Sequence, residues 1–253
     1  MRFLYLVHDP RWTESRVTDL MVERGHQVDY RCHQSGDPLP SLGEFGESYD
    51  GLIIGGGFVS VDAAPSQPFM ARQIEFTRAV VDHGHRFFGL CLGAHILGAA
   101  YGASVGPRPD GAAEFGFCPI AATAAGAKLF AGTTRVYQVH DEGLWDLPVE
   151  AELLAESDTF PIQAFGIGHR AFGVQFHPDA PSRAIESWWH DNTRLHGRIG
   201  AQSLPDQLDD AKRLEQSRTR WLNRFLDQWL SPVASNEQSD NEGEPQMAPE
   251  VRT

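Results

Sequence analysis

The sequence predicts an α/β fold, a three-layer sandwich in which helices cover both faces of a mostly parallel central sheet. In the first hundred residues, short apolar segments alternate with segments of helical periodicity, as in βαβ units. After Tyr101 the apolar segments are short, aromatic or β-branched and separated by Gly, Pro and Asp, which indicates further strands, some of them antiparallel. A length of 253 residues with 41% hydrophobic residues fits one large domain with a real core.

The elements of the first half are bounded by glycines and by changes of periodicity. The segment 68–83, for example, carries apolar residues at nearly helical spacing and stops at Gly84. The expected strands cover residues 1–9, 28–33, 49–57 and 86–90, and the expected helices cover 11–27, closing on Gly25, then 68–83 and 91–102.

The second half is expected to complete the domain, which we place at residues 1–230. Strands are predicted over 115–123, 134–140, 161–168 and 170–177, and helices over 181–195 and 205–230. Trp188-Trp189 and the stripe Trp221, Phe225 and Trp229 are interpreted as helix faces that pack on the sheet or on a partner subunit, so a homodimer is left open. Residues 231–253 are acidic and almost free of large apolar side chains, which indicates a disordered tail.

Composition excludes several classes of protein. With 21 Lys and Arg against 34 Asp and Glu, the net charge is −13, which argues against binding nucleic acid. The chain contains no apolar run of the roughly 18 residues needed to span a membrane, so no membrane partner is expected. Three cysteines are too few and too scattered for a disulfide framework, and the histidines show no zinc spacing. We therefore expect a cytoplasmic protein without a metal or other cofactor.

The segment Gly89-Leu90-Cys91-Leu92-Gly93 indicates a nucleophile. An apolar strand runs into a G-x-C-x-G turn and then a helix, which is the thiol version of the nucleophile elbow. The N-terminus of that helix favours the reactive thiolate. The alternative is a small buried core cysteine, the interpretation given to Cys32 and Cys118.

A base and an oxyanion site follow two other predicted strands. His177-Pro178-Asp179 ends the strand 170–177, so Asp179 is expected to turn back and orient the imidazole of His177, although such a segment can also be a simple turn. Gly55, Gly56 and Gly57 follow the strand 49–57, and their backbone amides are expected to join the Leu92 N–H in an oxyanion hole. A flexible turn or a phosphate loop is the alternative, but neither phosphate-loop glycine motif is present.

Taken in order, these segments resemble the class I, triad-type glutamine amidotransferases. That family carries a Gly-Gly-Pro-like loop, a G-x-C-x-G-x-Q elbow and a Q-F-H-P-E end motif, and here the same places hold Gly55-Gly56-Gly57-Phe58, residues 89–95 and Gln175-Phe176-His177-Pro178-Asp179. The segment 136–142 is similar to the family's strand that ends in His-x-Asp beside the glutamine pocket. The likeness covers roughly residues 2–230, and is greatest to stand-alone proteins similar to the glutaminase domain of GMP synthase.

The resemblance implies a flavodoxin-like fold and a glutaminase half-reaction. Cys91 would attack the side-chain amide of glutamine, His177 oriented by Asp179 would protonate the leaving ammonia, and the amides of Leu92 and of Gly56 or Gly57 would hold the oxyanion. Water would then release glutamate from a γ-glutamyl thioester. The ammonia would pass to an acceptor on a separate synthase subunit, since the family motifs occupy nearly all of the predicted domain. His95 and His140 would lie at the substrate pocket.

The sequence departs from the family pattern at two of these places. Asp179 stands where the family has Glu and is one methylene shorter. His95 stands where a Gln usually helps to bind glutamine; it either contacts a different γ-glutamyl or carboxylate substrate, marks a pocket that has lost glutamine, or is a packed helix residue. Two alternative functions therefore stay open: a cysteine hydrolase of other γ-glutamyl amides or peptides, and a catalytically idle regulatory or binding subunit on the same fold.

Overall fold

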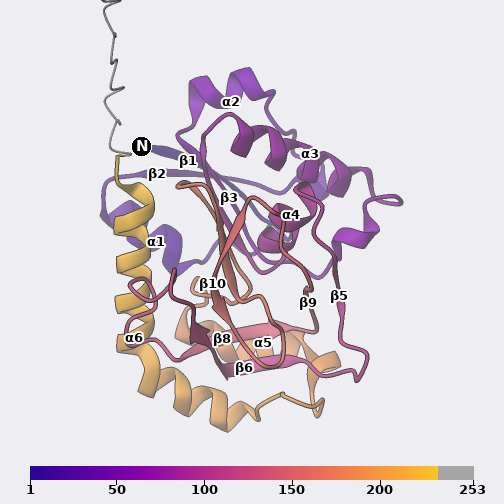
Figure 1. Ribbon diagram of the computed structural model, residues 1–253, viewed down its shortest axis with the longest axis vertical. Coiled ribbons are helices and arrows are strands. Elements are labelled where there is room, and N and C mark those ends of the chain that lie inside the picture. Colours follow the sequence, from indigo (N-terminus) through magenta and orange to yellow (C-terminus); the bar gives the residue numbers. More distant parts are fainter. Residues whose placement is uncertain (233–253) are drawn as a thin grey trace, which may run out of the picture.

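The computed structural model describes residues 1–232 and is built around an eight-stranded sheet (Figure 1). The strand order is β2-β1-β3-β4-β12-β11-β10-β7; the first five strands are parallel and the last three are added antiparallel. This arrangement confirms the mostly parallel sheet with antiparallel strands in the second half. In sheet order, the strands are β2 (Gln27–Arg31), β1 (Arg2–Leu6), β3 (Gly51–Ile54), β4 (Arg86–Leu90), β12 (Ala171–Val174), β11 (Ala164–Ile167), β10 (Ala151–Glu156) and β7 (Ala121–Ala122).

Helices cover both faces of this sheet, because the strands are apolar on both sides. In β1, Phe3 and Tyr5 belong to one buried cluster, and Leu4 and Leu6 belong to the cluster on the opposite face. The first cluster lies under α1 (Arg16–Glu23) and α6 (Leu204–Leu230). The second lies under α2 (Leu42–Ser48), α3 (Pro68–Asp82) and α4 (Leu92–Ala100). The predicted three-layer sandwich is therefore confirmed.

Helix α6 contributes the aromatic stripe noted in the sequence. Phe225 lies 4.2 Å from Phe88 between ring centroids, and Trp229 lies 5.2 Å from Phe3. Both partners are strand residues of the central sheet, so the stripe packs on the sheet rather than on a partner subunit. None of the helices within residues 1–232 is both long and apolar enough to cross a membrane.

Two small sheets and the α5 region lie outside the central sheet: β6, β8 and α5 lie together at the bottom of Figure 1, and β5 and β9 lie at its right. Each small sheet is a pair of antiparallel strands, and the α5 region connects β12 to α6. One small sheet pairs β5 (Val105–Pro107) with β9 (Glu142–Leu144), and the other pairs β6 (Glu114–Pro119) with β8 (Arg135–His140). Helix α5 (Ile185–Asp191) lies between the short 3-10 helices η3 (Ser182–Ala184) and η4 (Thr193–Leu195). Two further 3-10 helices, η1 (His33–Ser35) and η2 (Val61–Ala63), lie earlier in the chain.

The element boundaries differ from the sequence-based expectation in several places. The helix expected over 11–27 begins only at Arg16, and the short strands β5 and β9 were not predicted. The helix expected over 181–195 is broken, because the side-chain amide of Asn192 donates to the Trp188 carbonyl over 2.8 Å and ends α5. The short helix α2, closed by a capping box between Ser41 and Glu44, was not predicted. Nor was β10, whose sequence AELLAE favours a helix; pairing with β11 on one side and β7 on the other makes it a strand. The predicted tail at 231–253 falls outside the described residues except for its first two.

Candidate active site

The site lies at the carboxyl ends of four neighbouring strands, β1, β3, β4 and β12. Because these strands are parallel and adjacent in the sheet, the residues that follow them meet at one edge. They are His8, the loop Gly55–Gly57, Cys91 and the segment from Gln175 to Asp179.

Cys91 occupies a strained turn between β4 and α4. Its φ of 50° and ψ of −105° make it the only non-glycine residue with positive φ within residues 1–232. A Cβ at Gly89 would lie 2.4 Å from the Gly93 carbonyl carbon, and a Cβ at Gly93 would lie 2.1 Å from the Ile54 carbonyl oxygen. Both glycines of G-x-C-x-G are therefore required by close backbone packing, which holds the thiol at the N-terminus of α4.

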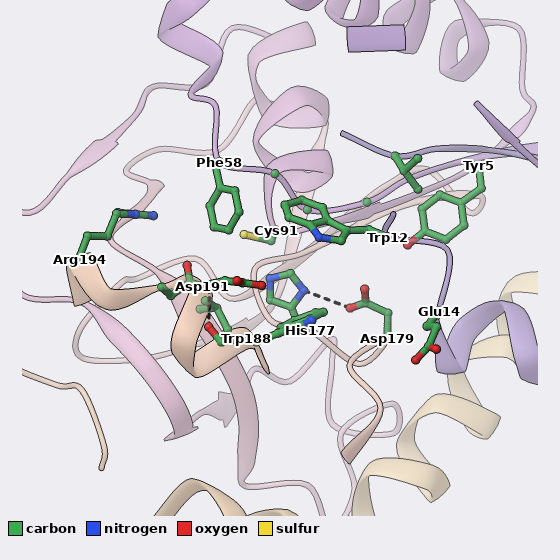
Figure 2. Close-up of a pocket in the computed structure, with 16 residues that line it drawn as sticks. Tyr5, Trp12, Glu14, Phe58, Cys91, His177, Asp179, Trp188, Asp191 and Arg194 are labelled. Atoms are coloured by element: carbon green, nitrogen blue, oxygen red, sulfur yellow. Dashed lines mark hydrogen bonds and ion pairs between the residues drawn. The ribbon is translucent and has the colours of Figure 1, made fainter. Parts of the chain in front are cut away.

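His177 is held between Cys91 and Asp179 (Figure 2). Its Nδ1 lies 3.2 Å from Asp179 Oδ1, and both side chains are buried. Burial by itself would lower the pKa of His177, but the Asp179 carboxylate and the Cys91 thiolate outweigh burial and raise that pKa to about 10. With Nδ1–H directed at Asp179, the other ring nitrogen is left for Cys91, as a base oriented by a carboxylate requires.

The glycine loop after β3 lies against the side chains of His177 and Cys91. A Cβ at Gly56 would lie 2.7 Å from His177 Cε1 and 3.7 Å from Cys91 Cβ. The N–H groups of Gly56 and Gly57 make no hydrogen bond within residues 1–232, and Leu92 is the first residue of α4, where an N–H has no helical partner. Three backbone donors are therefore free near the thiol.

His8 holds the peptide between Gly56 and Gly57. Its Nδ1 lies 2.9 Å from the Gly56 carbonyl oxygen, and its Nε2 lies 3.0 Å from Gln73 Oε1. Burial lowers the pKa of His8, so the ring is neutral and donates from one nitrogen only. In a trans peptide the N–H points opposite to the carbonyl, so fixing the Gly56 carbonyl also fixes the direction of the Gly57 N–H.

His95 reaches the thiol through Gln175. Its Nε2 lies 2.8 Å from Gln175 Oε1, and Gln175 Nε2 points at Cys91 Sγ over 3.8 Å. Burial lowers the pKa of His95 to about 4, so the imidazole is neutral at pH 7 and can donate from Nε2 to the Gln175 oxygen. His95 also lines a cavity beside Cys91.

His140 faces the same cavity, but both of its ring nitrogens are engaged. Nδ1 lies 2.8 Å from the Glu142 carbonyl oxygen, and Nε2 lies 3.0 Å from Glu114 Oε2. Glu114 is 2% exposed and also accepts hydrogen bonds from Ser157 and Gln163. His140 therefore lines the cavity and is held in place by a buried polar network around Glu114.

Two cavities meet at Cys91. One is polar and lies on the side of His95; the other lies on the side of His177 and is largely aromatic (Figure 2). Within the part of the chain that the structure describes, no group of three or more His, Cys, Asp or Glu side chains is arranged to hold a metal ion. The polar cavity is lined by Ser60, His95, His140, Asp141 and Glu142, among others, the aromatic cavity by Trp12, Glu14, His177, Trp188 and Asp191, among others, and both cavities by Phe58 and Arg194.

Residues 14–193 match the model of the glutamine amidotransferase class-I family. The chain belongs to the class I glutamine amidotransferases. A relative along nearly its whole length is the glutamine amidotransferase-like protein YfeJ of Salmonella typhimurium, 27% identical over 90% of this chain and 97% of YfeJ. GMP synthase (glutamine-hydrolysing) of Vibrio atlanticus is 31% identical over 65% of this chain, but the match spans only 31% of that longer enzyme.

Solved structures show the same fold. A glutamine amidotransferase from Thermotoga maritima superposes with a TM-score of 0.79 at 24% identity, over 92% of this chain and 99% of its own. One from Methylobacillus flagellatus gives a TM-score of 0.80 at 19% identity, over 91% of this chain and 93% of its own. The flavodoxin-like amidotransferase fold expected from the motifs is therefore confirmed.

Several residues at this amidotransferase site escaped the sequence reasoning. His8 lies two residues after the end of β1 in the parallel sheet, so its position was a usable signal, and Gln175 lies inside the quoted end motif. Trp12 and Arg194 carried no local signal, because they reach the site from a loop and from η4. Trp188 was interpreted only as a packing residue of a helix face, and in the structure it packs on His177 and on Tyr137 of β8.

Proposed function

We propose that this amidotransferase hydrolyses the side-chain amide of glutamine through Cys91, His177 and Asp179. The observation that carries the proposal is the thiol on its strained elbow beside an imidazole that is paired with a carboxylate. The raised pKa of His177 supports a protonated imidazole at neutral pH beside Cys91, and an imidazolium next to a cysteine sulfur favours the nucleophilic thiolate needed for acyl transfer.

The reaction runs in two halves. The Cys91 thiolate attacks the amide carbon, and the negative charge on oxygen is held by the N–H groups of Leu92 and of Gly56 or Gly57. The C–N bond breaks as His177 gives its proton to the leaving nitrogen, which releases ammonia and leaves a γ-glutamyl thioester. Water then attacks the thioester, giving its proton to His177, and glutamate and the Cys91 thiolate are released.

The polar cavity fits the α-amino acid end of the substrate. It offers the guanidinium of Arg194, which is paired with Asp141, together with Glu142, so both charges of an amino acid zwitterion have a counterpart. In this proposal neutral His95 stands at the position of the family's Gln, and its hydrogen bond to Gln175 positions the Gln175 amide beside the substrate. His140 supports the cavity wall.

The ammonia passes to an acceptor bound by a separate synthase subunit in the cytoplasm. The support is a relative that is itself one subunit of a glutamine-hydrolysing GMP synthase, that of Thermoplasma volcanium. It is 28% identical over 53% of this chain and 64% of its own length. In that organism the enzyme is thus made of more than one polypeptide, which is the arrangement that we propose here.

The decisive experiment combines a covalent label with a turnover assay. The glutamine analogue 6-diazo-5-oxo-L-norleucine should modify Cys91, located by peptide mass spectrometry, and Cys91→Ala should reduce ammonia release from glutamine by about a thousandfold or more. Cys118→Ala, another buried free cysteine, is the matched control and should keep both label and turnover. An unlabelled Cys91 together with equal ammonia release by Cys91→Ala would refute the proposal.

A further inference from the structure

The aromatic cavity on the side of His177 has a lining that glutamine does not need. Trp12 and Phe58 pack edge to face with ring centroids 5.0 Å apart, and Trp188 packs edge to face against His177 at 5.0 Å. Phe58, which lines both cavities, is 57% exposed, so a large apolar ring stands partly in solvent beside Cys91 (Figure 2). Ammonia, the leaving group of glutamine, is too small and too polar to use such surfaces.

The position of the cavity says which part of a substrate would enter it. The leaving nitrogen takes its proton from His177, so this nitrogen must lie on the side of His177. His177 and Asp179 line the aromatic cavity, whereas the polar cavity lies on the side of His95. A substrate with its γ-glutamyl group in the polar cavity would direct any substituent on the amide nitrogen toward Trp12, Phe58 and Trp188.

The charge of the cavity rim is mainly negative. Asp191 forms no ion pair within residues 1–232, and Glu14 is paired only with Arg183, where both side chains are largely exposed. The lining holds two cations, and each is paired with a carboxylate: the His177 imidazolium with Asp179, and the Arg194 guanidinium with Asp141. An unpaired carboxylate beside aromatic faces is a combination that favours an organic cation.

We infer that this cavity is a subsite for the leaving amine, and that the site hydrolyses N-substituted γ-glutamyl amides whose amine carries an apolar body and a second positive group. The inference rests on the proposed function, and glutamine is the smallest substrate of this class. The chemistry is unchanged: the C–N bond breaks, His177 protonates the nitrogen, and the free amine leaves in place of ammonia. Water then hydrolyses the thioester to glutamate and the thiol.

The test compares four substrates by glutamate release: glutamine, γ-glutamyl methylamide, γ-glutamyl benzylamide, and the benzylamide with a para-aminomethyl group. We expect kcat/KM for the benzylamide to exceed that for the methylamide about tenfold, because burying an additional apolar group in an apolar pocket typically changes kcat/KM by about this factor. The aminomethyl group should add about threefold at low salt through Asp191, and Asp191→Asn should remove this gain.

Variants of the aromatic lining separate the subsite from general effects. Trp12→Ala should bring the benzylamide-to-methylamide ratio close to one. Trp145→Ala is the matched control, because this indole is 38% exposed and lies outside both cavities; it should keep the ratio. A wild-type ratio of one or less, or a ratio unchanged by Trp12→Ala, would overturn the subsite and favour a protein partner on this surface.

Failure of the subsite and failure of the proposed function have different signatures. If glutamine is hydrolysed with a labelled Cys91 but the ratio is one, only the leaving-amine subsite is wrong. If neither glutamine nor any of the amides gives Cys91-dependent glutamate, the proposed function itself is wrong.

Discussion

His95 and Gln175 lie 80 residues apart in the chain and are joined by a hydrogen bond of 2.8 Å between Nε2 and Oε1. The bond places a neutral imidazole behind the amide that points at Cys91 Sγ. Substitution of the family's usual Gln by His at this position therefore adds a titratable group to a buried hydrogen-bond chain.

The first expectation concerns stability against pH. Burial lowers the pKa of His95 from 6.5 to about 4, so between these values the unfolded chain binds more protons than the folded one. The stability that this group confers is present above pH 6.5 and is lost as the pH falls toward 4. We expect His95→Gln to reduce the loss of unfolding free energy between pH 7 and pH 5 by about 2 kcal/mol in urea denaturation.

The control for that measurement is His190→Gln, on an exposed position of α5, which should leave the pH dependence unchanged. If wild type and His95→Gln lose equal unfolding free energy between pH 7 and pH 5, His95 does not titrate in this range.

The second expectation concerns His8 and the peptide that it holds. His8→Ala frees the Gly56 carbonyl, so the Gly57 N–H is no longer directed, and kcat for glutamine should fall about tenfold, less than the loss of a whole oxyanion donor. KM should stay within about twofold, because the bond acts on the developing charge rather than on bound substrate. Steady-state ammonia release measures both.

His8→Asn provides the matched rescue. The Asn amide nitrogen occupies nearly the place of the imidazole Nδ1 and can donate to the Gly56 carbonyl, so it should recover most of kcat. A rise of KM with unchanged kcat in His8→Ala would contradict the positioning role.

The third expectation concerns the space at Gly56. A Cβ there would come within 2.7 Å of His177 Cε1, so Gly56→Ala should displace the imidazole and lower glutamine hydrolysis about a hundredfold or more while the chain stays folded by circular dichroism. Gly43→Ala, in α2, meets nothing within 4 Å and should keep full activity with a stability gain of about 1 kcal/mol. Equal activity of the two variants would place His177 elsewhere during the reaction.

Much of the site was predictable because its components are local. The elbow is recognised from five consecutive residues, since only glycine fits the contacts at 89 and 93. His177 and Asp179 are two residues apart, so their hydrogen bond follows from one strand end. The alternation of apolar segments likewise predicted the parallel sheet and its two covered faces, whereas β10 was missed because its local preference is helical.

The sequence by itself determined the elbow turn at Cys91, the pairing of His177 with Asp179 and the fold class, because each depends on backbone sterics or side-chain periodicity within a few residues. Only the tertiary structure decided that His8 lies on the Gly56 carbonyl, that Gln175 lies between His95 and Cys91, and that Trp12 meets Phe58 beside the thiol. These contacts join residues from different strands, helices and loops. They depend on which strand ends are neighbours in the sheet and on how the segments around them pack, and no local pattern encodes that packing.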